Sequence, residues 1–184
     1  MKKATGIVRR IDDLGRIVIP KEIRRTMRIR QGDQLEIYTT DEGEVMLKKY
    51  SILEELADTA ELLAESVNKA CGMTMVITDN DTVVACAGIS KTDILKHIVS
   101  QEFRNVTDSR QLYIWLSKDR KIPVNSRQDK YFVKTGMPIL CDGDIIGSVA
   151  AIEINNSLSE PTETEIQIVK TLAVYLGKQL ELES

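Results

Sequence analysis

Residues 5–25 read TGIVRRIDDLGRIVIPKEIRR, and this stretch contains two short apolar runs and six basic residues. The pattern predicts a strand over residues 5–11, a tight turn, and a second strand over residues 16–19. Gly15 can supply the positive φ angle that such a turn requires. Pro20 ends the second strand and is well placed as the first residue of a short helix.

The second predicted strand carries three consecutive apolar residues (17–19), a pattern that indicates burial on both faces. Residues 34–38 and 44–48 alternate instead, and the turn between them predicts a half-buried hairpin. A segment of about fifty residues without a cysteine seldom builds a sufficient core alone. We therefore expect residues 1–50 to form an obligate dimer with shared strands.

The charge of the chain is divided unevenly along the sequence. The whole chain has a net charge of −3 and a pI of about 5.4. Residues 1–30 hold ten Lys/Arg against three acidic residues, a net +7, and residues 1–50 together carry +4, which leaves −7 for the remainder. Such asymmetry indicates an acidic partner of the N-terminal segment, either nucleic acid or an anionic membrane.

Arginines dominate the basic segment, and their positions are informative. On the predicted helix, which runs to about Arg28, the residues Lys21, Arg24 and Arg28 share one face. Arg9 and Arg16 lie on the two predicted strands. A planar guanidinium can donate two hydrogen bonds to a phosphate or a guanine edge, so the pattern favours salt-sensitive DNA binding. The alternative is a solvated basic face without a ligand.

Residues 4–50, and the stretch 5–25 above all, resemble the DNA-binding module of the AbrB-like transition-state regulators of spore-forming bacteria. The resemblance implies a β-rich swapped-hairpin domain, an interleaved dimer β-barrel with a short helix. It also implies that basic residues of the strands and the helix contact double-stranded DNA. Matched position by position, the contacts are Arg9, Arg16, Arg24 and Arg25, with Lys3, Arg10, Lys21 and Arg28 as secondary ones.

Residues 51–71 predict a connecting helix that opens the second domain. Ser51 and Glu54 have the spacing of a capping box. Apolar residues recur at spacings of three and four from Leu53 onward, and Gly72 ends the pattern. Two interpretations stay open, because such a helix can pack on its own sheet or pair with its copy in a dimer.

Residues 72–184 predict an α+β domain. Strands are expected over 73–78, 82–87, 131–140 and 144–154, with a short helix near 94–99 and a closing helix over 162–182. Strands enclosed by an opening and a closing helix favour one antiparallel sheet with helices packed on it. Residues 100–130 show no clear pattern, although the apolar run 112–116 is expected to be buried.

A second resemblance lies in residues 137–152. The motif MPIL at 137–140, the Asp142-Gly143 turn and the run IIGSVAAI at 145–152 resemble a GAF domain, a sensory α+β module. An AbrB-like domain joined to a GAF-like domain implies a regulator of sporulation genes in the forespore, acting as an activator or a repressor. It also implies a homotetramer joined through both domains. Sensing of a small molecule stays open, and no ligand-binding residue is assigned.

Other function classes have little support in the sequence. No run reaches the roughly 20 apolar residues of a membrane span, and no apolar signal core follows the first residues. Cys71, Cys86 and Cys141 are too far apart for a metal motif or a disulfide framework, and His97 is the only histidine. We expect a cytoplasmic, nucleoid-associated protein without cofactor, metal or catalytic activity, whose partners are double-stranded DNA and its own copies.

Two other functions stay open. One is an antitoxin-type swapped-hairpin dimer that neutralises a toxin through a C-terminal tail and autoregulates its own operon. The other is a ligand-dependent enzyme or signalling domain that uses the basic segment as an anchor. A domain-sized segment after residue 55 speaks against the first, and the lack of a catalytic grouping speaks against the second.

Overall fold

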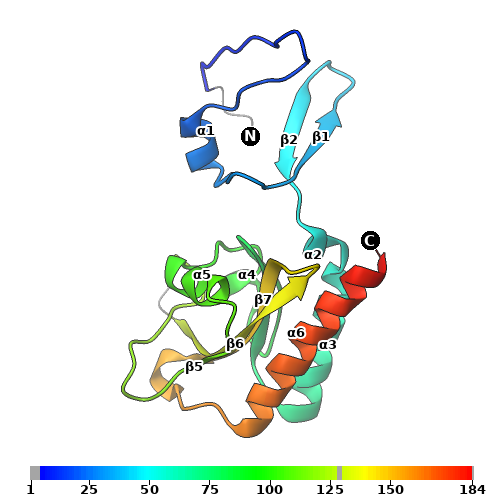
Figure 1. The fold of residues 1–184 in the computed structure, drawn as a ribbon. Helices are drawn as coiled ribbons and strands as arrows, with labels where there is room; N and C mark the ends of the chain where they lie inside the picture. Colours follow the sequence, from blue (N-terminus) through cyan, green and yellow to red (C-terminus); the bar gives the residue numbers. More distant parts are fainter. Residues whose placement is uncertain (1–4, 128–129, 184) are drawn as a thin grey trace. The chain divides into compact units, whose positions relative to one another are not determined.

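The computed structural model describes residues 5–127 and 130–183. The chain divides into two compact units, Met1–Tyr50 and Ser51–Ser184 (Figure 1). The N-terminal unit contains one short helix and one hairpin, whereas the larger C-terminal unit contains a five-stranded sheet and its helices.

The N-terminal unit consists of helix α1 (Lys21–Thr26) and the antiparallel strands β1 (Leu35–Thr39) and β2 (Val45–Lys49). Ile37 lies opposite Leu47, which confirms the predicted hairpin. The predicted half-burial of its apolar face is wrong, because Ile37 is 66% and Leu47 37% exposed. The other described residues of this unit leave both side chains accessible to water.

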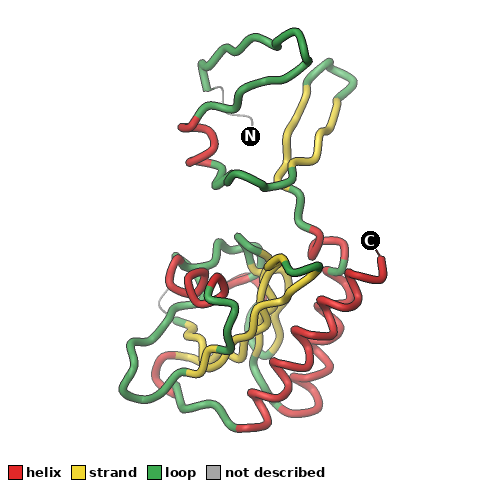
Figure 2. The backbone as a smooth tube through the Cα atoms, viewed as in Figure 1, coloured by secondary structure: helices red, strands yellow, loops and turns green. Residues whose placement is uncertain are grey.

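Residues 5–19 form loop, in contrast to the two strands predicted there (Figure 2). Val8 is 85% exposed and Val18 74%. Among the described residues of this unit, only Pro20 is buried. Residues 17–19 are therefore not buried within the single chain, and their burial in a dimer stays a prediction, since a strand needs a neighbour for its hydrogen bonds and its side chains.

The C-terminal unit is an antiparallel sheet of strand order β4-β3-β7-β6-β5 with helices on both faces. Its elements are α2 (Ile52–Glu55), α3 (Ala57–Cys71), β3 (Met75–Asp79), β4 (Val83–Ala87), α4 (Lys91–Ile94), α5 (Gln101–Asp108), β5 (Tyr113–Ile114), β6 (Tyr131–Cys141), β7 (Asp144–Ile154) and α6 (Glu163–Glu183). The predicted order of strands and the closing helix is confirmed.

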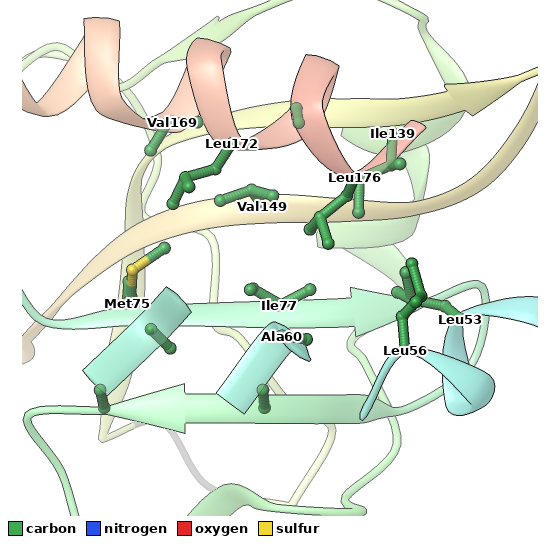
Figure 3. Close-up of a cluster of buried hydrophobic side chains, with 14 of the residues drawn as sticks. Leu53, Leu56, Ala60, Met75, Ile77, Ile139, Val149, Val169, Leu172 and Leu176 are labelled. Atoms are coloured by element: carbon green, nitrogen blue, oxygen red, sulfur yellow. The ribbon is translucent and has the colours of Figure 1, made fainter. Parts of the chain in front are cut away.

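Both faces of this sheet are buried, which explains its almost continuously apolar strands. Neighbouring residues of a strand point to opposite faces. Met75 and Ile77 of β3 accordingly join the cluster on the side of α3 and α6, whereas Val76 joins the cluster that contains Phe103 of α5. Figure 3 shows the first cluster, with Leu176 of α6 among its members. Each such buried side chain contributes about 1.5–3 kcal/mol.

Residues 51–71 form two helices instead of the single predicted one, because the chain turns at Leu56, the last residue before α3. Leu53 and Leu56 both enter the core (Figure 3). The predicted capping box is wrong: within the described part of the chain, Ser51 Oγ makes no hydrogen bond. Of the two interpretations of this segment, the structure shows packing on its own sheet, through β3 and β4. Gly72 ends α3 as predicted, with a φ of 68°.

Residues 100–130 contain α5 and the short strand β5. Ser100 caps α5, because its Oγ accepts a hydrogen bond at 3.0 Å from the backbone N–H three residues further on. The burial expected for the apolar run in this segment holds for Trp115. It is wrong for Ile114 and Leu116, which are 38% and 39% exposed.

Ion pairs from the buried Lys134 to two partly exposed carboxylates hold α6 against the sheet. Lys134 of β6 is 6% exposed, and its Nζ lies 2.8 Å from Oε1 of Glu165 on α6 and 3.5 Å from Oε2 of Glu153 on β7. Burial by itself raises the pKa of Glu165, but hydrogen bonds from Lys134 and from Thr162 outweigh it. The net pKa of Glu165 is therefore below its ordinary value of 4.5.

Replacing Glu165 by Gln is expected to lower the free energy of unfolding by about 1.5–3 kcal/mol at neutral pH, the range for a hydrogen bond to a charged group. A carboxyl whose pKa is lower in the folded state stabilises that state above its unfolded pKa. The wild-type protein therefore loses this contribution as the pH falls below about 4.5, and the Gln variant has none to lose. Urea unfolding of both proteins from neutral to acidic pH measures the difference, and a gap that stays constant would contradict the prediction.

Candidate nucleic-acid interface

The turn at residues 12–15 presents Arg16. Gly15 has a φ of 76°, and the backbone N–H of Asp12 donates to the carbonyl of Arg16 at 3.1 Å. The carboxylate of Asp12 closes the same turn. Its Oδ1 accepts from the backbone N–H groups of Leu14 at 3.0 Å and Arg16 at 2.7 Å. Its Oδ2 accepts from Nε of Arg16 at 2.8 Å, while the Arg16 side chain remains 70% exposed.

The hydrogen bonds of this turn favour the ionised form of the Asp12 carboxylate. Hydrogen bonds from the backbone N–H and then from the guanidinium of Arg16 lower the pKa of Asp12, so the carboxylate is ionised at neutral pH. Sequence reasoning placed Asp12 in the turn and assigned it no contact with a basic side chain. The available signal was the spacing of an acid four residues before an arginine, with a glycine between them.

Helix α1 carries Lys21, Arg24 and Arg25, and all three are exposed. These three positions lie within about one turn of helix and share a face, as predicted for the first two. The predicted place of Arg28 on that face is wrong. Helix α1 ends with Met27 as its C-cap, and Arg28 has a φ of 56°, which lies in the left-handed region and cannot continue the helix.

The remaining predicted contacts lie in the loop before the turn. Arg9 and Arg10 are exposed, and Nη1 of Arg9 donates to the neighbouring carbonyl of Val8 at 3.1 Å. Lys3 lies outside the described residues. All the other basic residues predicted to contact DNA are therefore on the surface, where a phosphate can replace water at each charged group.

The contacts of His97 and the burial of two cysteines fit a structural role for these residues. The carbonyl of His97 accepts from the N–H of Val83 at 3.0 Å, at the start of β4. Cys86 and Cys141 are buried, and burial raises the pKa of both thiols, which disfavours the reactive thiolate. In residues 5–127 and 130–183, no three His, Cys, Asp or Glu side chains gather so as to bind a metal ion. No helix among them has both the length and the apolar character of a membrane span.

The two units match two family models. The model "Stage V sporulation protein T C-terminal, transcription factor" matches residues 55–181, and the model "Antidote-toxin recognition MazE, bacterial antitoxin" matches residues 8–53. The first match covers more than half of the chain. The chain therefore belongs to the stage V sporulation protein T family of transcription factors.

Two curated relatives agree with this assignment. Stage V sporulation protein T of Bacillus subtilis (strain 168) is 42% identical over 179 residues, which cover 97% of this chain and 99% of that protein. The transition state regulatory protein AbrB of the same organism is 47% identical over 70 residues, or 38% of this chain and 72% of AbrB. The predicted AbrB-like character of the N-terminal unit is thus confirmed.

Two solved structures match parts of the chain. The solution structure of the N-terminal DNA recognition domain of AbrB from Bacillus subtilis is 56% identical and covers 27% of this chain and 92% of that chain, with a TM-score of 0.25. The crystal structure of a methyl-accepting chemotaxis protein, residues 122 to 287, is 17% identical and covers 71% of this chain and 93% of that chain, with a TM-score of 0.51. At that identity the second likeness concerns the fold alone. The predicted α+β fold, one antiparallel sheet with helices packed on it, is confirmed.

Proposed function

We propose that this chain regulates sporulation genes in the forespore by binding double-stranded DNA as a homo-oligomer. The contacts are assigned to Arg9, Arg16, Arg24 and Arg25, with Lys3, Arg10, Lys21 and Arg28 in support. The observation that carries the proposal is an exposed arginine on a closed turn, followed in the chain by an arginine-bearing helix, in a unit of net charge +4. The proposal assigns no catalytic step and no cofactor to the chain.

The N-terminal unit supports a dimer. Most of its large apolar side chains are exposed, among them Val8, Val18 and Ile37 at 85%, 74% and 66%. Covering a side chain of this kind is worth about 1.5–3 kcal/mol, and a second copy of the unit has the same apolar residues to offer. Residues 5–11 and 16–19 would then find in the second copy the strand neighbours that a single chain does not provide.

The C-terminal unit supports a second contact between copies, and hence a tetramer. Helices α3 and α6 cover the same face of the sheet (Figure 1). Their outer surfaces expose Leu62 on α3 at 65%, and Val174 and Leu182 on α6 at 54% and 83%. Apolar side chains on two helices of one face favour helix packing against another copy.

The sequence preference of such a surface is expected to depend partly on the shape of the DNA. A loop, a turn and a helix of six residues offer no long recognition helix for the major groove. Phosphate contacts then fix the position of the protein, while groove width and bendability of the DNA contribute to selectivity. A two-fold dimer favours sites with two-fold character.

Replacing Arg16 or Arg24 by Ala is expected to weaken DNA binding about thirtyfold or more, because a two-fold dimer loses two arginine contacts worth about 1–3 kcal/mol each. The slope of log affinity against log salt should fall by about 1 for each phosphate that the variant no longer neutralises, hence by about 2 in a two-fold dimer. Gel-shift titrations at several salt concentrations measure both quantities. The probe is a duplex that the wild-type protein enriches from a random-sequence pool.

Arg120→Ala serves as the matched control for this experiment. Arg120 lies in the C-terminal unit, its side chain is 87% exposed, and its change removes the same charge. This variant should bind like the wild-type protein. Unaltered affinity of both the Arg16 and the Arg24 variants, in chains that remain folded, would refute the assignment of the DNA contacts.

The antitoxin alternative is favoured by the MazE match to residues 8–53. An antitoxin of this type needs a C-terminal segment that is available to a toxin. The described residues 51–127 and 130–183 instead form a sheet with two buried clusters, and residues 55–181 match the transcription-factor model. The DNA-binding regulator is therefore the better supported function.

Ligand sensing by the C-terminal unit stays a prediction. A thermal-shift screen with small metabolites tests it, because a compound that binds the folded state in preference to the unfolded state raises the melting temperature.

A further inference from the structure

We propose that Asp12 is a positioning residue for DNA recognition. Its carboxylate accepts a hydrogen bond from Nε of Arg16 and so orients the guanidinium, whose two terminal nitrogens then meet the DNA in one orientation. This orientation raises the ratio of specific to non-specific affinity for DNA. This inference rests on the proposed function, because it assigns to Arg16 a contact with DNA.

The two oxygens of the Asp12 carboxylate accept hydrogen bonds from different groups. Oδ1 accepts the backbone N–H groups of Leu14 and Arg16, at 3.0 and 2.7 Å, and so closes the turn. Oδ2 accepts Nε of Arg16 at 2.8 Å and so fixes the side chain. Because the carboxylate is itself held by the backbone, the Nε contact orients the guanidinium relative to the turn.

A guanidinium has two edges that can form paired hydrogen bonds. Contact at Nε leaves the outer edge, Nη1 and Nη2, facing away from the carboxylate, and this edge can donate to O6 and N7 of a guanine or to phosphate oxygens. A long side chain that is already oriented loses less conformational entropy when it binds. Orientation therefore favours the DNA sequence that matches the outer edge.

The same carboxylate must weaken non-specific binding. DNA phosphates repel a negative charge at the interface, whichever sequence they belong to. Asp12 therefore lowers affinity for all DNA and is expected to raise the ratio of specific to non-specific affinity. These opposite effects separate a positioning role from a general electrostatic one.

Asp12→Asn tests the inference with little change of shape. The Asn Oδ1 can still accept the two backbone N–H groups, whereas its Nδ2 group cannot accept from Nε of Arg16. Asp13→Asn is the matched control, because it removes the same charge from the neighbouring exposed residue. Full-length variants are titrated with the enriched duplex and with a scrambled duplex at equal salt.

Both variants should bind the scrambled duplex more tightly than the wild-type protein, and by similar factors. Only Asp12→Asn should lose selectivity, with a ratio of specific to non-specific affinity about tenfold below that of Asp13→Asn. Arg16→Lys keeps the charge and the turn but lacks Nε, so it should lose selectivity to a similar degree. Adding Asp12→Asn to Arg16→Lys should then lower the ratio no further. If Asp12→Asn reduces the melting temperature, Asp12→Glu takes its place, because it keeps the charge but moves the carboxylate away from the turn; it should lose selectivity without binding the scrambled duplex more tightly.

The outcomes separate this inference from the proposed function. A wild-type protein that enriches no sequence, together with an Arg16→Ala variant that binds as well as it does, overturns the DNA-binding assignment. Clear selectivity of the wild-type protein with equal ratios for Asp12→Asn and Asp13→Asn overturns the positioning role alone. A further loss when Asp12→Asn is added to Arg16→Lys also overturns it, because Asp12 then acts by another route.

Discussion

A Val18→Asp variant is expected to lose the folded N-terminal dimer and, with it, detectable DNA binding. Val18 is 74% exposed in the single chain, and the proposed dimer buries it. Burying valine is worth about 1.5–3 kcal/mol, and two-fold symmetry counts it twice, or about 3–6 kcal/mol per dimer. That corresponds to roughly a hundredfold to ten-thousandfold in the dimer dissociation constant, before the cost of burying a carboxylate is added.

Hydrogen exchange of the full chain measures the effect on each unit separately. Amides of residues 5–50 should lose protection in the variant, whereas those of the C-terminal sheet should keep it. Gln31→Asp is the control, since it adds the same charge at an exposed polar position of the same unit. A Val18→Asp protein with unchanged protection of residues 5–50 and an unchanged sedimentation coefficient would exclude the dimer proposed for this unit.

A Gly177→Ala variant is expected to lose about 3 kcal/mol or more of the free energy of unfolding, which lowers the melting temperature by roughly 10 °C. In an ordinary helix this change is stabilising by up to about 1 kcal/mol. Here a Cβ on Gly177 would lie 2.1 Å from the backbone carbonyl oxygen of Leu140 on β6. Helix α6 would have to move away from the sheet, and Leu176 and Leu180, which flank the contact, would lose their packing.

Gly136→Ala makes the same chemical change on β6, the strand that Gly177 of α6 contacts. The atoms nearest to a Cβ at Gly136 are 3.5 Å away or more, an ordinary contact distance, so this variant should unfold at nearly the wild-type temperature. Thermal unfolding followed by circular dichroism compares the two. Equal melting temperatures for both variants would show that α6 adjusts to the added methyl group at no cost.

Much of the C-terminal fold follows from local patterns in the sequence. The Asp142-Gly143 turn and the apolar runs on either side of it were sufficient to predict β6 and β7. The helical spacing of apolar residues near the end of the chain was sufficient to predict α6. The break at Leu56 was not predictable, because one helical spacing of apolar residues runs through both α2 and α3. The turn there is decided by the sheet on which the helices pack, not by any residue with a special backbone conformation.

For the N-terminal unit, the sequence predicted which residues are basic and which need cover, but the cover itself depends on contacts beyond the single chain. The apolar run at residues 17–19 correctly indicates a need for cover, and the structure shows that the single chain does not supply it. The basic residues could be named from the sequence, since charge and exposure are local properties. The contact between Asp12 and Arg16 was missed, because the spacing of the two residues brings them together only where a glycine turn returns the backbone within hydrogen-bond distance.

The exposed apolar residues of the N-terminal unit also bear on gene control in the cell. If two copies must meet before the basic surface is complete, its amount rises with the square of the free chain concentration when the protein is scarce. A gradual accumulation of the protein would then produce a sharper onset of promoter occupancy. The timing of the response would be encoded in the chain itself, without any added signal molecule.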